Sequence, residues 1–145
     1  MSLVIDIADA VTAELNAAPP GTFTPSFTAM RRVLPEFDLA DLADLKVSVV
    51  PKRVEITGST RSASQYEIAV DIGIQKKLGK DLDSEVAALS TLVDQIADYL
   101  RRRPLGAAPF ASWVSIGNEP VYAPEHLAEQ RVFTSVLTVS YRALK

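Results

Sequence analysis

The stretch QYEIAVDIGIQ, residues 65–75, alternates apolar and polar side chains from end to end. The apolar side carries Tyr66, Ile68, Val70, Ile72 and Ile74, and the other side carries Gln65, Glu67, Ala69, Asp71, Gly73 and Gln75. Strict alternation over this length is typical of a β-strand with one face on a core and the other in water or at an interface. The fold is therefore expected to centre on a long, half-buried strand.

The segment before this strand is expected to be its hairpin partner. Residues 46–57 contain two short strand-type runs, 47–50 and 53–56, which are separated by Pro51. The sequence GSTRSAS, residues 58–64, is a turn by composition. A long hairpin is therefore predicted, with its tip at the turn.

Two segments have the periodicity of amphipathic helices. Within residues 3–18 an apolar residue recurs every four positions, and the Pro-Pro-Gly sequence at 19–21 ends the pattern. Within residues 80–103 apolar residues follow a 4-3-4-3-4 spacing, and Pro104 and Gly106 stop the helix. Its last turn is expected to hold Arg101, Arg102 and Arg103, where cations complement the helix dipole.

Three further strands complete the expected sheet. Residues 22–34 read as extended, and Pro25 places that strand at an edge or breaks it. Residues 111–117 form a short strand around Trp113, and residues 120–130 read as a loop plus a helical turn that starts at Pro124. Residues 131–144 alternate with apolar side chains on both faces, so this last strand is expected to be central in the sheet.

The order α-β-β-β-α-β-β defines the expected fold class. Adjacent strands joined by turns predict antiparallel pairing. The chain of 145 residues fits one domain, residues 1–145. The prediction is an α+β two-layer sandwich with a mostly antiparallel sheet and two helices packed on one face.

Composition excludes several function classes. The chain has no cysteine, which removes disulfides, thiolate nucleophiles, zinc–thiolate sites and iron–sulfur clusters. The net charge of −3 argues against free duplex DNA as the main partner. No membrane span or secretory signal is expected, because no apolar run approaches the roughly 18–20 residues needed and two aspartates interrupt the first apolar segment.

No catalytic, cofactor or metal site is predicted. His126 is the single histidine, and its neighbours Glu125 and Glu129 could in principle join it at a metal, but a histidine in a polar loop is usually a surface residue. The aspartates at 38, 41 and 44 recur every third position, whereas an EF-hand loop uses alternate positions and a glycine. The scattered glycines form no phosphate-binding loop.

The arginines form the basic clusters of the chain, Arg31 with Arg32 and Arg101 with Arg102 and Arg103. One interpretation is that they serve solubility and, at the second cluster, the helix dipole. The other is that they form a patch that faces DNA phosphates or an acidic partner.

The sequences at 49–56 (VVPKRVEI), 66–77 (YEIAVDIGIQKK) and 133–141 (FTSVLTVSY), taken with the two helices, resemble the small tail-terminator and head–tail joining proteins of long-tailed bacteriophages. The resemblance covers most of the chain. It implies a structural virion protein without enzymatic activity or cofactor, made in the host cytoplasm and located in the tail or neck. Its partners would be further copies in a hexameric ring, the tail tube protein and the head connector or stopper.

On that resemblance, the hairpin tip would contact a neighbouring protein. The tip residues are Thr57, Gly58, Ser59, Thr60, Arg61 and Ser62. An acidic lumen would let DNA pass without specific binding, because bound phosphates would slow its passage.

Other functions remain open at this point. One is another neck role, such as a head-completion or stopper protein. A different class is a small bacterial α+β ligand-binding domain or enzyme, which would show a deep pocket with titratable groups. A regulatory module of the toxin–antitoxin kind is a third class, and the acidic charge opposes a DNA-binding version of it.

Overall fold

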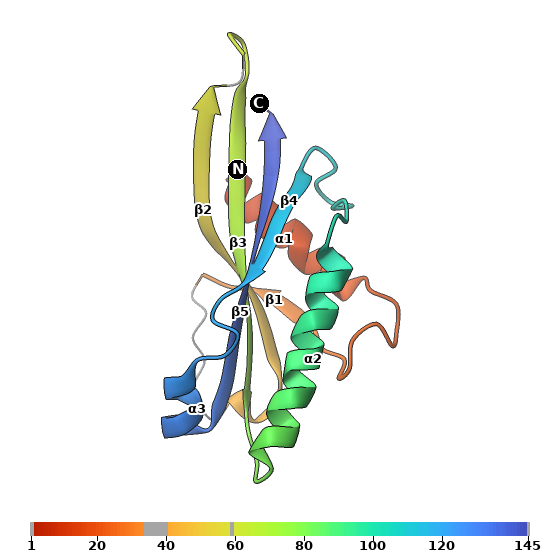
Figure 1. The fold of residues 1–145 in the computed structure, drawn as a ribbon. Coiled ribbons are helices and arrows are strands. Elements are labelled where there is room, and N and C mark those ends of the chain that lie inside the picture. Colours follow the sequence, from red (N-terminus) through yellow and green to blue (C-terminus); the bar gives the residue numbers. More distant parts are fainter. Residues whose placement is uncertain (1, 34–40, 59, 145) are drawn as a thin grey trace.

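A five-stranded sheet with the strand order β1-β2-β3-β5-β4 forms the centre of the molecule (Figure 1). The computed structural model describes residues 2–33, 41–58 and 60–144. The strands are β1 (Ala29–Arg31), β2 (Lys46–Gly58), β3 (Ser64–Lys77), β4 (Ser112–Asn118) and β5 (Val132–Leu144). The helices are α1 (Leu3–Asn16), α2 (Leu82–Leu100) and α3 (Pro124–Gln130), with a 3-10 turn, η1, at Asp41–Ala43. This arrangement confirms the predicted α+β class.

Strand pairing is mostly antiparallel, as predicted. The pairs β2–β3, β3–β5 and β4–β5 are antiparallel, and β5 lies inside the sheet between β3 and β4. The predicted edge position of the first strand is confirmed, because β1 is an edge strand that begins after Pro25. Its expected length and pairing were wrong, because β1 spans only three residues and pairs with β2 in parallel. Residues 32–45 connect these two strands, and a parallel crossover needs about a dozen residues, so no tight turn forces the strands to be antiparallel.

The two short runs in residues 46–57 belong to one continuous strand that contains a β-bulge. The register with β3 shifts between Pro51 and Arg53, which leaves Lys52 as the extra residue. Before the bulge, odd-numbered residues such as Val49 face the core side of the sheet; after it, even-numbered residues such as Val54 do. A single inserted residue therefore explains why the apolar alternation in the sequence changes phase at the proline.

The core lies on the apolar face of β3, which we call the core face. Ile68, Val70, Ile72 and Ile74 of this face are fully buried. They form one hydrophobic cluster with buried side chains from both long helices, including Ile7 and Val11 of α1 and Leu92 and Ile96 of α2. The helices thus supply the apolar surface that the alternating pattern of residues 65–75 requires.

The main helix ends earlier than predicted. α2 stops at Leu100, and the backbone of Arg101 is extended, with φ −58° and ψ 119°. Arg102 follows with a positive φ of 59°. The three arginines therefore form a turn after the helix instead of its last turn, which corrects the expected boundary at Arg103. At its other end the helix begins at Leu82, two residues after the expected start, and the Asp81 side chain caps it by accepting a hydrogen bond from the backbone N–H of Ser84 at 3.3 Å.

Candidate interaction surfaces

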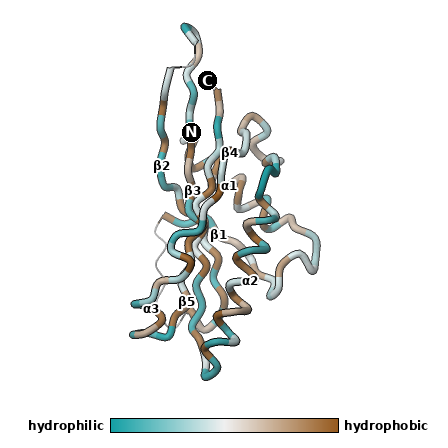
Figure 2. Tube along the Cα trace, viewed as in Figure 1, coloured by the Kyte–Doolittle hydropathy of each residue, from teal (hydrophilic) through white to brown (hydrophobic). Residues whose placement is uncertain are grey.

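The β2–β3 hairpin extends beyond the part of the sheet that the helices cover (Figure 1). We call its outer part, residues 53–58 of β2 and 64–67 of β3, the arm. Every residue of the arm on β2 is exposed, and those on β3 are half-buried. Hydrophobic and hydrophilic residues alternate along this part of β2 (Figure 2). The β2 side of the arm therefore presents exposed apolar side chains, Val54 and Ile56, whereas Tyr66 on the β3 side still packs against the core.

The tip of the arm holds the residues that the resemblance assigned to a partner contact. Thr57 and Gly58 end β2, and Thr60, Arg61 and Ser62 follow; all five are exposed. Ser59 lies outside the described residues. The turn is closed locally: the backbone N–H of Thr60 donates to the carbonyl oxygen of Ala63 at 3.1 Å, and the Thr60 hydroxyl accepts from the Ala63 N–H at 3.0 Å.

Two edges of the sheet are open in the described part of the chain. β1 covers β2 only at Val47–Val49, so the arm segment of β2 has β3 on one side and no strand on the other. β4 pairs with β5 alone and forms the opposite edge. The β2 edge carries two large exposed apolar side chains, Val54 at 40% and Ile56 at 56%. An open, partly apolar strand edge is a template for pairing with another chain.

The sheet face opposite the core carries a polar cluster at its centre. The Lys52 ammonium lies 3.5 Å from Oδ1 of Asp71. The Thr138 hydroxyl donates to the same carboxylate oxygen at 2.6 Å. The Lys52 side chain therefore reaches Asp71 of β3 and Thr138 of β5 on this face. The three polar side chains bind one another.

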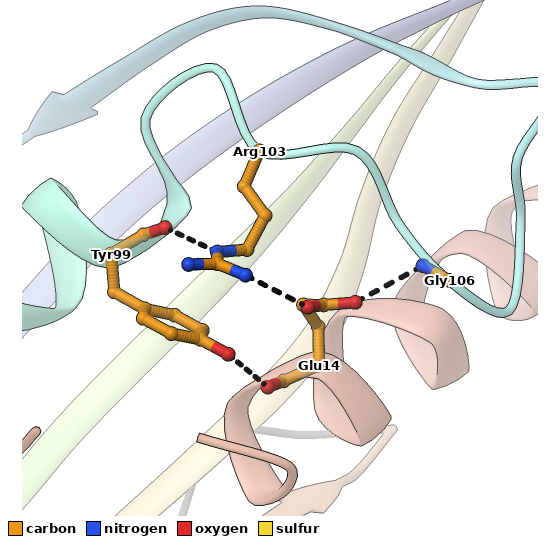
Figure 3. A network of polar contacts seen from close by, with 4 residues as sticks. All are labelled: Glu14, Tyr99, Arg103 and Gly106. Atoms are coloured by element: carbon orange, nitrogen blue, oxygen red, sulfur yellow. Dashed lines mark hydrogen bonds and ion pairs between the residues drawn. The ribbon is translucent and has the colours of Figure 1, made fainter. Parts of the chain in front are cut away.

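The arginine turn is tied to α1 by a network that sequence reasoning missed (Figure 3). Glu14 Oε2 lies 3.5 Å from Arg103 Nη1, and Glu14 Oε1 accepts from the Gly106 N–H at 3.0 Å. The Tyr99 hydroxyl donates to the Glu14 carbonyl oxygen at 3.1 Å. The partners of Glu14 come from the end of α2 and from the turn that follows it, so they lie far from Glu14 in the sequence.

The three arginines of the turn differ in their surroundings. Arg103 is held by Glu14 and Tyr99, whereas Arg101 and Arg102 are exposed. Arg102 and Arg103 line a cleft of about 320 Å³, and Arg101 does not. In the other basic cluster, Arg31 pairs with Asp9 at 2.9 Å. The hairpin tip and the arginine turn lie apart, so they form two separate surfaces (Figure 1).

Two buried polar groups belong to residues that are opposite each other in the β4–β5 pair, Trp113 and Tyr141. The Tyr141 hydroxyl and the Trp113 indole N–H have no hydrogen-bond partner among the described residues. Burial, with a smaller contribution from the charge of Glu14, raises the pKa of Tyr141 above its usual value of 10.0. Tyr141 is therefore neutral and enclosed at ordinary pH.

The residues considered for metal binding do not gather into a site in the described part of the chain, where no group of three His, Asp or Glu side chains could hold a metal. His126 lies on α3, and its Nδ1 is 2.9 Å from the Thr134 hydroxyl oxygen. Asp44 is exposed, and Asp38 lies outside the described residues. No helix in the described ranges has both the length and the apolar character to cross a membrane.

In comparisons with known proteins, no family model matches the chain, and no curated protein is significantly similar to it in sequence. The functional interpretation therefore depends on the surfaces described above: the arm, the two sheet edges and the arginine turn.

Proposed function

We propose that this chain is a structural protein of a long-tailed phage particle, which assembles as a hexameric ring, caps the tail tube and joins it to the head connector. One observation carries the proposal: the sheet has open edges on two different strands, and one of them continues into a projecting arm. This arrangement supplies the type of surface that the resemblance to tail-terminator proteins leads us to expect.

The two edges fit the geometric requirement of a ring. A cyclic ring is heterologous, so each subunit must present two different, matching patches. Pairing of a strand from one copy with an edge strand of the next supplies main-chain hydrogen bonds, and alternate side chains supply specificity. In this chain the arm segment of β2 would present Val54 and Ile56, and β4 of the neighbouring copy would present the opposite edge.

The arm tip is the part that would reach a partner above or below the ring. Thr57, Gly58, Thr60, Arg61 and Ser62 are exposed at the end of a hairpin that the helices do not cover. These residues are small and uncharged apart from Arg61, so the tip presents hydrogen-bonding groups and one positive charge to a partner. The tail tube protein and the head connector or stopper are the proposed partners.

Charge supports a passive conduit for DNA. With a net charge of −3, the chain repels a polyanion overall, and DNA would pass the lumen without specific binding. The arginine turn is therefore expected to lie away from the lumen. A ring in which Arg101 and Arg102 line the channel would contradict this part of the proposal.

Electron microscopy of particles from a producing culture, labelled with an antibody against this chain, tests the proposal. Label at the junction of head and tail supports a terminator or neck role. Reconstitution with purified tail tubes then distinguishes the roles, because a terminator binds tube ends directly and a head-completion or stopper protein binds the connector. An absence of label on every particle, with a protein that stays monomeric when tubes are added, contradicts the proposal.

A further inference from the structure

A cleft of about 320 Å³ lies beside the arginine turn. It is lined by Arg102, Arg103, Pro104, Pro109, Ala111, Ser112 and Trp113. Two guanidinium groups thus share one concave surface with an indole ring and two prolines. Aromatic and arginine side chains in one cleft are the residue types that dominate binding energy at protein interfaces.

The two arginines of the cleft are held in different ways. Arg103 donates from Nε to the Tyr99 carbonyl oxygen at 2.8 Å and from Nη1 to Glu14 at 3.5 Å. A guanidinium has five N–H bonds, and these two contacts use two of them; the other three have no acceptor among the described residues. Arg102 is exposed and has a positive φ of 59°, a conformation that costs energy for any residue except glycine.

We propose that this cleft binds an acidic segment of a partner protein, with a carboxylate between Arg102 and Arg103 and an adjacent apolar side chain against Trp113 and the prolines. Arginine binds a carboxylate through paired, charge-assisted N–H bonds, which are stronger than neutral hydrogen bonds. Glu14 and Tyr99 hold one guanidinium in position before the ligand arrives, so less side-chain entropy is lost on binding.

The observations favour a peptide carboxylate over the phosphates of a nucleic acid. Nucleic-acid binding depends on several neutralised phosphates along an extended basic surface, whereas this cleft presents the two guanidinium groups of Arg102 and Arg103. A cleft with proline and indole walls instead accommodates the apolar part of a peptide.

The chain contains one tryptophan, Trp113, so its fluorescence reports on the cleft directly. The probe is the blocked peptide Asp-Glu-Phe-Glu-Asp, and the control peptide is its amide counterpart Asn-Gln-Phe-Gln-Asn. Titration is followed by Trp113 emission and, on the same samples, by calorimetry. We expect saturable binding of the acidic peptide and none of the amide peptide.

Two arginine variants separate binding from folding. Arg102→Gly should weaken binding by about tenfold or more, which is the loss expected for a charge-assisted hydrogen bond. It should not lower the unfolding temperature, because glycine adopts a positive φ without strain. Arg101→Ala, next to it but outside the cleft, should leave the affinity unchanged within about twofold.

Three results would overturn the inference. They are an absence of saturable binding of the acidic peptide, an equal loss of affinity in Arg101→Ala and Arg102→Gly, and tighter binding of a single-stranded oligonucleotide than of the peptide. The last result would identify a phosphate-binding surface instead. None of these outcomes depends on whether the chain forms a ring, so this inference and the proposed function can fail separately.

Discussion

The guanidinium of Arg103 stacks on the ring of Tyr99, with its central carbon 3.9 Å from the ring centroid, and its Nε donates to the carbonyl oxygen of the same residue at 2.8 Å. The stack stabilises the turn that follows α2. Because the same guanidinium also lies 3.5 Å from Glu14, it links the C-terminal ends of the two long helices. Arg103 therefore has a structural role in addition to its place in the cleft.

Replacing Arg103 should destabilise the fold measurably. We expect Arg103→Ala to lower the free energy of unfolding by about 1–2 kcal/mol, since it removes the stack and two hydrogen bonds at a partly exposed site. Arg103→Lys should recover only part of this loss, because an ammonium lacks the planar group that stacks on Tyr99. Equilibrium urea unfolding measures both variants. Arg101→Ala is the control, and its free energy of unfolding should stay within about 0.5 kcal/mol of that of the parent. If Arg103→Ala is as stable as the parent, the contacts of Arg103 with Tyr99 and Glu14 contribute nothing to stability.

Charge on the open edge of β2 should block assembly without affecting the fold. Ile56 is 56% exposed and lies on the arm, so Ile56→Lys should change the free energy of unfolding by less than about 0.5 kcal/mol. The same change should abolish assembly of the chain into rings on purified tail tubes, measured by sedimentation. Val121→Lys is the matched control, because Val121 is 54% exposed but lies outside the strands. Association of Ile56→Lys at the level of the parent would exclude the β2 edge as an interface.

The parts of the fold that could be predicted from the sequence were those in which the spacing of apolar residues is regular along the whole element. The alternation in residues 65–75 correctly assigned Ile68 and Ile72 to the core face. The parts that could not be predicted depend on a single inserted residue or on pairing between strands that are far apart in the sequence. A single bulged residue, Lys52, divides one strand into two apparent runs. The parallel pairing of β1 with β2 has no local signal, because the two strands are separated by residues 32–45.

The candidate surfaces were predictable to a similar extent. The hairpin tip could be located because turn residues such as Gly58 separate two strand patterns. The arginine turn could not be separated from the helix, because a basic run suits a helix C-terminus as well as a loop. The role of Arg103 depends on Glu14, which lies far away in sequence and has no distinguishing motif.

The stability of the fold should fall at high pH through Tyr141. Burial raises the pKa of Tyr141 in the folded state above its usual 10.0, so the unfolded chain loses this proton more easily. Its contribution is therefore fully present below about pH 10 and is lost as the pH rises further, at about 1.4 kcal/mol per pH unit. Tyr141→Phe should remove this loss, and urea unfolding of parent and variant at about pH 8 and pH 11 measures the difference. Parallel losses in both proteins would show that Tyr141 ionises as easily in the folded state as in the unfolded chain.

The contact between Gly73 and Ser48 should be detectable as an energetic coupling between β3 and β2. The two residues are opposite each other in the antiparallel pair, and a Cβ at Gly73 would lie 3.1 Å from the Ser48 hydroxyl oxygen. Ser48 is fully buried and its hydroxyl has no partner in the described part of the structure. We expect Gly73→Ala to destabilise the protein by about 1–2 kcal/mol, because the fully buried Ser48 hydroxyl must shift to admit the methyl group. Ser48→Ala alone should be neutral or stabilising, since it removes an unpaired buried hydroxyl. The double variant should recover most of the loss, and a double-mutant cycle from urea unfolding gives the coupling free energy. Strictly additive effects would show that the strands adjust around Gly73 without contact with Ser48.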